Sequence, residues 1–341
     1  MAVHTPKIFI DGRKVEFVSG KLNTRGFNTA SQLDFTIIDK SVSYRKYWNK
    51  EVTVFFNPTD GTPIFRGRII NSKMVDEIGM GFTAVNGFGF LTGHHKATVT
   101  LDDLDNVDGL SPGGTIAKLI SLANLSDVVG TDYIGDTNPV VQVKPLRGSI
   151  VILDVIKNIL KTVANTSATL VRENYIRVFD DGEKTQLKFE VMADLDTTEP
   201  VKTYSNDNII TFKVSNRKIP TTIVVEGNKA RATYTHSSAA EAYGSNFLIV
   251  KNKLLESRAD CMDFAQKILD ANLQNKYEYT LSTTDGVYLN EGDVIEIIND
   301  DVDISGNFRV VGKKIDFSSG KYKLVLTINK SPPILAQFLV Q

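Results

Sequence analysis

Two short β-strand patterns lie in the first quarter of this sequence, and both recur in the same order near its end. Residues 50–54 (KEVTV) correspond to residues 292–296 (GDVIE), and residues 65–69 (FRGRI) correspond to residues 308–312 (FRVVG). In each case a β-branched strand begins beside a charged residue, a turn-rich stretch follows, and an aromatic residue with arginine opens the returning strand. Short β stretches also resemble one another by chance, so the pattern alone leaves duplication and coincidence open. A duplication would give the chain two similar β modules.

The sequence around the first pattern alternates apolar and polar residues with the period of a half-buried strand. Residues 32–39 (QLDFTIID) alternate over three periods, and residues 7–10, 52–56 and 64–70 are further short runs separated by turn sequences. Six or seven antiparallel strands at this spacing predict a small β-barrel or sandwich. We expect this first barrel to occupy residues 1–95.

Helical periods replace the alternation in the middle of the chain. Residues 115–123 and 152–163 place apolar side chains at i, i+3, i+4 and i+7, with short strands between and after them. We therefore predict an α/β insertion domain over residues 96–200.

Strand patterns then return and are interrupted by one long helix. The predicted second barrel comprises residues 201–250 and 276–330, and the helix between them covers residues 251–275. Residues 331–341 form an apolar tail that we expect to dock. The fold class predicted from the whole sequence is thus a β-rich α+β protein, with two similar small antiparallel β-barrels, an α/β insertion and a long helix.

The sequence motifs that suggest catalysis or metal binding lack groups that those functions need. Residues 109–113 (GLSPG) match the G-x-S-x-G nucleophile motif, but Pro112 lacks the backbone N–H that the oxyanion hole needs after Ser111, so a turn into a helix is the better interpretation. Cys261 is the single cysteine and only four histidines are present, which excludes an internal disulfide and a Cys-rich zinc site. Two acidic stretches are interpreted as solvated loops, with adventitious calcium as the alternative. We expect no catalytic residue, no cofactor and no metal.

Charge and hydropathy exclude two further classes of protein. With 39 basic and 40 acidic residues the formal net charge is −1, so no overall field gathers nucleic acid or anionic lipid. The sequence has no run of about 18 apolar residues that could form a membrane helix. Its first residues do not have the pattern of a signal peptide, so we expect the protein to be cytoplasmic when made, or to leave the cell by a route other than a signal peptide.

Two groups of apolar residues are candidate interface residues. They are Tyr44, Tyr47, Trp48, Ile334, Leu335 and Phe338. The three aromatic residues stand at i, i+3 and i+4, which is typical of a short helix that covers the first barrel, and a protein–protein contact is the alternative. The other three residues belong to the apolar tail, which would dock on its own chain or on a neighbour.

Taken together, these residues resemble the tail or baseplate hub proteins of bacteriophages and phage-like injection machines. This family includes the late-control protein D type and the N-terminal hub part of type VI secretion spike proteins. The similarity covers most of the chain and is strongest over residues 265–328, where a long helix is followed by residues 289–297 (LNEGDVIEI) and 306–311 (GNFRVV). Residues 222–227 and 64–69 also resemble the family's sequences at the positions that they occupy in the chain.

The resemblance implies a homotrimer with pseudo-sixfold symmetry. Three chains with two barrels each would form a ring of six, and so would join a sixfold tail tube to a threefold spike or tail tip around a central channel. The implied partners are further copies of this chain, the tail tube protein and the spike or tail-tip protein. The resemblance also implies the tape measure protein and baseplate wedge proteins as partners, and DNA would pass through as cargo. The implied location is the virion tail, after assembly in the host cytoplasm.

Two functions of other classes remain as alternatives. A tail-tip hydrolase of cell-wall glycan or peptide would need a convergent acid–base or metal set. A β-rich receptor- or carbohydrate-binding module would need exposed aromatic platforms, for which Tyr44, Tyr47 and Trp48 are the compact candidates.

Overall fold

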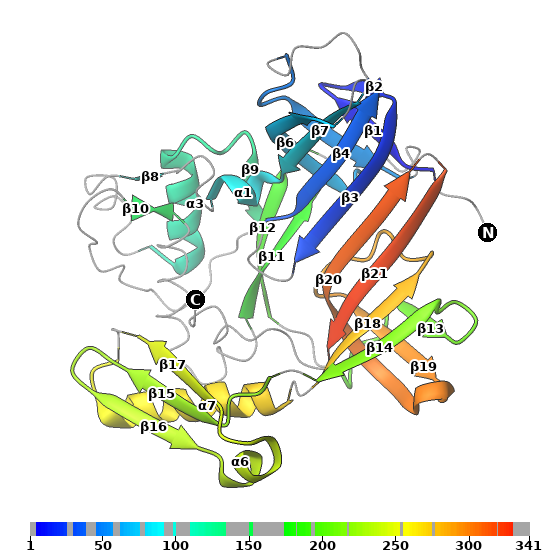
Figure 1. Ribbon diagram of the computed structural model, residues 1–341. Helices are drawn as coiled ribbons and strands as arrows, with labels where there is room; N and C mark the ends of the chain where they lie inside the picture. The colour runs from blue at the N-terminus through cyan, green and yellow to red at the C-terminus, as the bar shows by residue number, and fades with distance from the viewer. Residues whose placement is uncertain are drawn as a thin grey trace.

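The protein has a β-rich α+β fold dominated by one large sheet (Figure 1). The computed structural model describes residues 5–25, 30–38, 46–56, 62–75, 79–91, 98–99, 110–133, 150–152, 174–181, 183–191, 195–216, 218–252, 255–274, 277–318 and 320–329 of the 341-residue chain. In Figure 1 the large sheet fills the right side, and two smaller units lie to its left, one above the other.

The large sheet contains thirteen described strands. They are β1 (Lys7–Ile10), β2 (Arg13–Val15), β3 (Phe17–Arg25), β4 (Gln32–Ile38), β5 (Glu51–Phe55), β6 (Phe65–Met74), β7 (Gly79–Val85), β13 (Lys202–Ser205), β14 (Thr211–Asn216), β18 (Tyr277–Thr283), β19 (Val294–Asn299), β20 (Ile304–Ser318) and β21 (Lys321–Asn329). The alternation predicted over residues 32–39 becomes strand β4, whose buried side chains Leu33, Phe35 and Ile37 face the core.

One pairing joins the two ends of the chain. Strand β20 is fifteen residues long, and its first part pairs with β19 while its last part, from Gly312 to Ser318, pairs antiparallel with β3. The blue β3 and the orange β20 lie side by side in Figure 1. The prediction of two similar small antiparallel β-barrels is not confirmed, since the described strands form no closed barrel. Strand β20 extends past its own hairpin and makes both halves one continuous sheet.

Both halves of this sheet have the same strand order. The N-terminal half runs β3-β4-β7-β6 with β5 beside β6, and the C-terminal half runs β14-β18-β21-β20 with β19 beside β20. The order along the chain also matches strand by strand. Each half has a bulge at the same place, between Ile69 and Asn71 of β6 and between Val310 and Gly312 of β20. The repeated sequence patterns thus form corresponding hairpins, β5–β6 and β19–β20.

The halves differ at their outer strands. Strand β1 pairs antiparallel with β5, whereas β13 pairs parallel with β19. Both halves nevertheless share one apolar core, in which Leu22 and Phe35 of the first half lie in the same cluster as Ile315 and Leu326 of the second. Burial of this cluster is the main stabilising contribution to the sheet.

The remaining elements form two α/β units beside the large sheet. The first contains α1 (Gly87–Leu91), β8 (Thr98–Val99), α3 (Pro112–Leu122), β9 (Val129–Tyr133), β10 (Ile150–Val151), β11 (Asn174–Asp180) and β12 (Thr185–Val191). The second contains β15 (Thr222–Glu226), β16 (Arg231–Thr235), α6 (Ser237–Tyr243), β17 (Phe247–Lys251) and α7 (Arg258–Gln274).

Helices α3 and α7 occupy two of the three regions in which the sequence predicts helices. Apart from Ile152, the helix predicted over residues 152–163 lies outside the described residues. Ser111 caps α3, since its side chain accepts a hydrogen bond from the backbone N–H of Gly114, and Pro112 opens the helix. This geometry agrees with a turn into a helix at residues 109–113. Helix α7 packs Phe264 and Ile268 in one core cluster with Ile223 and Val225 of β15.

Gly20 of β3 lies where the two halves meet, and its lack of a side chain is required there. A Cβ atom at this position would lie 2.2 Å from the ring of Phe317 on β20, which is its direct register partner. We expect Gly20→Ala to destabilise the protein by about 1–3 kcal/mol through overpacking, measured as a lower midpoint of urea unfolding.

Ser19→Ala is the matched control for this substitution, because Ser19 is the neighbouring residue on the solvent side of the same strand. It should leave the midpoint almost unchanged. A second substitution, Phe317→Leu, should recover part of the loss in the Gly20→Ala protein. Equal midpoints for Gly20→Ala and Ser19→Ala would contradict the assigned contact.

Candidate functional site

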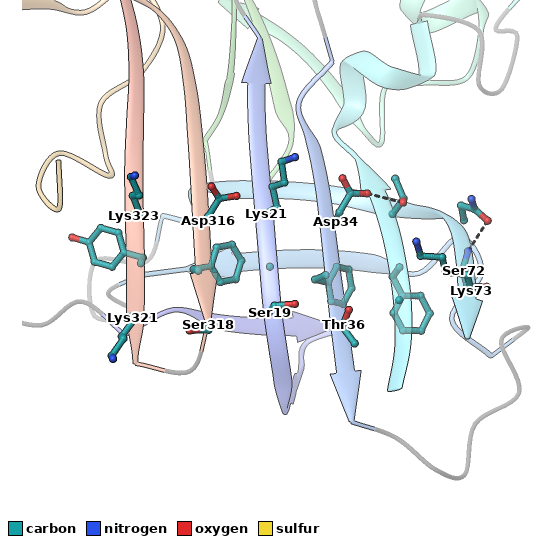
Figure 2. Close-up of a pocket in the computed structure, with 18 residues that line it drawn as sticks. Ser19, Lys21, Asp34, Thr36, Ser72, Lys73, Asp316, Ser318, Lys321 and Lys323 are labelled. Atoms are coloured by element: carbon teal, nitrogen blue, oxygen red, sulfur yellow. Dashed lines mark hydrogen bonds between the residues drawn. The ribbon is translucent and has the colours of Figure 1, made fainter. Parts of the chain in front are cut away.

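The face of the large sheet opposite its apolar core carries charged and polar side chains in rows across six strands. The strand register places one residue from each of β21, β20, β3, β4, β7 and β6 in such a row. The first row is Lys323, Asp316, Lys21, Asp34, Thr83 and Asn71. Figure 2 labels its first four members. Positive and negative side chains alternate over its first four positions, and opposite charges that face each other across strands stabilise a sheet.

A second row on the same face lies two residues further along each strand. It consists of Lys321, Ser318, Ser19, Thr36, Gly81 and Lys73. Its four central positions carry short side chains or none, while a lysine stands at each end. The short side chains leave the face hollow, and the two rows line a shallow cavity of about 700 Å³.

The row between these two points into the core. It contains Tyr322, Phe317, Gly20, Phe35, Phe82 and, at the β6 edge, Ser72. The rings of Phe35 and Phe82 stack with their centroids 5.4 Å apart. Successive residues of a strand point to opposite faces, so the same strands supply an aromatic core and a polar hollow.

The polar hollow has an excess of positive charge. Asp316 forms an ion pair with Lys314 at 2.6 Å, and Asp34 accepts a hydrogen bond of 2.7 Å from the hydroxyl of Thr83. Lys21, Lys73, Lys321 and Lys323 form no ion pair with any described residue. The hollow is therefore cationic, although the chain as a whole has a formal charge of −1.

Two buried cations on β20 hold the loop before β19. The Lys313 ammonium donates hydrogen bonds to the carbonyl oxygens of Val287 and Leu289, at 3.1 and 2.8 Å, and Arg309 Nη1 donates to that of Gly292 at 3.0 Å. Buried charged groups are tolerated when such hydrogen bonds replace water. The loop is thus fastened to the strand that joins the two halves.

A buried tyrosine fastens the same loop at its start. The Tyr204 hydroxyl of β13 donates a hydrogen bond of 2.8 Å to the carbonyl oxygen of Asp285. Burial raises the pKa of Tyr204 well above its usual value, and the nearby Asp285 carboxylate adds to this effect. The hydroxyl therefore remains a hydrogen-bond donor at neutral pH.

The candidate interface residues separate into described and undescribed ones. Tyr47 packs edge-on against the ring of Phe82, with centroids 5.3 Å apart, so it contributes to the core of the first half. Trp48 is 52% exposed. Tyr44, Ile334, Leu335 and Phe338 lie outside the described residues, and their role as interface residues stays a prediction.

The described residues contain no group of three or more histidine, cysteine, aspartate or glutamate side chains arranged to hold a metal ion. Nor does any helix in this part of the chain reach the length and hydropathy needed to span a membrane. Cys261 is buried against Ala230, and burial raises the pKa of its thiol. Such a thiol is poorly reactive.

Sequence reasoning missed the polar hollow. Its signal was the spacing of charged or hydroxyl residues two positions apart, as in Ser19 and Lys21, Asp34 and Thr36, or Asp316 and Ser318. This spacing shows that both members of a pair share one face of their strand. It does not show which strands are neighbours, and only the pairing of β20 with β3 brings the pairs into rows.

The fold is that of known tail proteins. A tail protein from Neisseria meningitidis MC58 superposes with a TM-score of 0.69 at 15% identity, over 98% of each chain. The 43 kDa tail protein of prophage MuSo2 from Shewanella oneidensis gives 0.63 at 10% identity, over 99% of this chain and 100% of that one. No protein-family model and no curated protein sequence matches the chain.

A third similar structure links the fold to secretion machines. It is an Escherichia coli component of the type VI secretion system, described as structurally similar to the T4 bacteriophage tail proteins gp27 and gp5. Its TM-score is 0.55 at 12% identity, over 94% of this chain and 76% of that one. The resemblance to phage tail and baseplate hub proteins, inferred from the sequence, is thus confirmed at the level of the fold.

The alternating row gives a test of the register. Lys21 lies between Asp316 and Asp34, so Lys21→Glu would place three carboxylates in adjacent strands. We expect a loss of stability of about 0.5 kcal/mol, because like charges that face each other across strands repel. The loss should shrink in concentrated salt, where the Debye length falls to about 3 Å.

Lys321→Glu is the control for charge reversal on the same face, because its register partner is the neutral Ser318. Its effect on the urea midpoint should be smaller than that of Lys21→Glu and less dependent on salt. Equal, salt-independent shifts for both variants would show that the row is not aligned as described.

Proposed function

We propose that this protein is the structural hub of a phage tail or a phage-like injection machine. It would act as a homotrimeric symmetry adaptor that joins a sixfold tail tube to a threefold spike or tail tip around a central channel. The observation that carries the proposal is the repeated strand order, in which each half contributes four antiparallel strands to one continuous row. Three chains then present six similar four-stranded units, which is what a threefold body needs to meet a sixfold one.

The polar hollow fits the wall of such a channel. It spans strands of both halves, and it carries solvent-exposed lysines and short hydroxyl side chains in place of an apolar docking surface. The similar fold of tail proteins and of a type VI secretion component supports a tail role. A non-enzymatic function follows from the proposed role.

Partners and location follow from the same proposal. They are two further copies of this chain, the tail tube protein and the spike or tail-tip protein, with the tape measure protein and baseplate wedge proteins as further neighbours. DNA would pass as cargo. The hub would lie in the virion tail after assembly in the host cytoplasm. The insertion over residues 96–200 and the tail at residues 331–341 would serve as docking elements beside the ring.

No observation specifically supports either alternative function. A hydrolase would need a convergent set of acid, base or metal ligands, and the described residues show no such metal cluster. A carbohydrate-binding module would use aromatic platforms, but Tyr47 packs into the core and leaves Trp48 as the exposed ring of that group in the described part of the chain.

Light scattering of the purified full chain tests the proposal. A homotrimer of the 37.7 kDa chain has a mass of about 113 kDa, and negative-stain images should show a ring with a central hole. The measurement should cover a range of protein concentrations, because subunit association depends on concentration. A monomer of 37.7 kDa at every concentration would overturn the proposal.

A further inference from the structure

We propose that the hub ring closes by strand pairing between copies: β6 of one chain pairs antiparallel with β14 of the next, and Met74 lies opposite Val214. This inference rests on the proposed trimer and assigns its interface. It uses two free strand edges, the direction of the strands and the repeated topology of the two halves.

Both edges lie at the ends of one row of eight strands. The row is β14-β18-β21-β20-β3-β4-β7-β6, and β14 pairs only with β18 in the described part of the chain. The last part of β6, beyond its bulge, pairs with β7 on one side, whereas β5 on the other side reaches only to Arg68. In the described part of the chain no strand pairs with residues 71–74 at that edge, where the Ser72 N–H donates to the side-chain oxygen of its neighbour Asn71 at 2.8 Å. An edge that no strand covers invites another strand.

The strand directions permit the two edges to meet. All seven pairings within the row are antiparallel, so the first and eighth strands run in opposite directions. A rotation about a ring axis carries β14 of the next chain beside β6 without reversing it. The new pair is then antiparallel, like every other pair in the row. A row with an odd number of strands would not allow this.

The repeated topology supplies the register. Asn71 lies opposite Thr83 just after the bulge of β6, as Gly312 lies opposite Thr327 just after the bulge of β20. Following the pairs across each half, from Thr83 through Asp34 to Lys21 and from Thr327 through Thr280 to Lys213, makes Lys213 the counterpart of Lys21.

The strand register between the two halves of one chain therefore predicts the strand register between neighbouring chains. Within the chain, Ile315 of β20 lies opposite Leu22 of β3. The counterparts of these two residues are Met74 of β6 and Val214 of β14. The same transfer places Lys73 opposite Ser215, as Lys314 lies opposite Asn23.

Exposure of these side chains supports the register. Ile315 and Leu22 are 0% exposed, whereas Met74 is 78% exposed and Val214 is 45% exposed. Each exposed residue is on the core side of its strand, since Met74 faces Met80 of β7 and Val214 faces Tyr279 of β18. The apolar core thus reaches both edges of the row and ends there uncovered. Pairing β6 with β14 would cover both side chains.

Other strand edges do not meet these conditions. Strand β2 is three residues long and carries the exposed Arg13 and Lys14, which are typical of an edge protected from pairing. Strand β17 exposes Phe247 and Ile249, but it belongs to a separate three-stranded sheet that has no counterpart in the N-terminal half.

The closed ring would have the hollow polar face on its inside. Three rows of eight strands, spaced by about 4.8 Å, give a circumference of about 115 Å and a diameter of about 37 Å between backbones. The lysines of the two rows would line this channel, while the shared apolar core would lie in the wall.

Cysteine cross-linking tests the register directly. Lys73→Cys and Ser215→Cys together place two solvent-facing thiols opposite each other across the proposed interface, at a Cβ distance of about 4.5–5.5 Å. The native Cys261 can stay, since it is buried and its thiol is poorly reactive. We expect oxidation or a short bifunctional maleimide to yield covalent trimers on a denaturing gel, and each single variant to yield none.

Two paired variants serve as controls. Asn23→Cys with Lys314→Cys occupies the equivalent position within one chain, and should cross-link without any increase in mass. Lys73→Cys with Lys14→Cys joins β6 to the edge of β2, and should give no trimer. A trimer by light scattering that cross-links through Lys14→Cys, or through neither pair, overturns the inference and leaves the proposed function standing. A monomer by light scattering overturns both.

A single substitution tests the apolar contact without cysteines. Met74→Asp would bury a carboxylate in the interface, and we expect trimer association to weaken by about tenfold or more. Val302→Asp, at an exposed site near the β19–β20 turn, is the matched control and should leave association unchanged. Thermal unfolding should show that both variants fold. A folded Met74→Asp protein that associates as tightly as the control contradicts the register.

Discussion

The pairing of β20 with β3 is the interaction on which the rest of the structure depends. It joins strands nearly three hundred residues apart and turns two four-stranded units into one row. The pairing also places charged residues of both halves in register on one face, and aromatic residues of both halves in register on the other. Without it, the hollow face would be two unrelated surfaces and the apolar core would be split. The close contact of Gly20 with Phe317 lies at this junction.

The same strand shows how a polar function is carried on an apolar scaffold. Along β20, Asp316 and Ser318 face solvent, Ile315 and Phe317 face the core, and Lys313 reaches through the interior to two loop carbonyl groups. A buried ammonium group requires such partners, so the loop and the strand fix each other. Stability and surface chemistry therefore depend on the same backbone alignment.

The sequence analysis succeeded where local patterns decide the structure. Alternation identified β4, the apolar stripe located α7 within a few residues, and the recurring patterns marked corresponding hairpins. It failed where distant strands meet, because the pairing of β20 with β3 depends on contacts that no local window contains. That pairing joins the two predicted β modules in one continuous sheet. Helix α1 was also missed, since Gly87 and Gly89 lower helix propensity and buried packing, with all five residues covered, overrides it.

The connections between equivalent strands differ greatly in length. Six residues, 26–31, lead from β3 to β4, whereas the corresponding connection from β14 to β18 covers residues 217–276 and contains the β15–β17 sheet with α6 and α7. In a closed assembly of three chains this appendage would mark every second four-stranded unit. A partner that contacts only the strand row would meet six nearly identical binding positions, whereas a partner that contacts the appendage would meet three. One molecule could thus present a different rotational order to each neighbour without any conformational change.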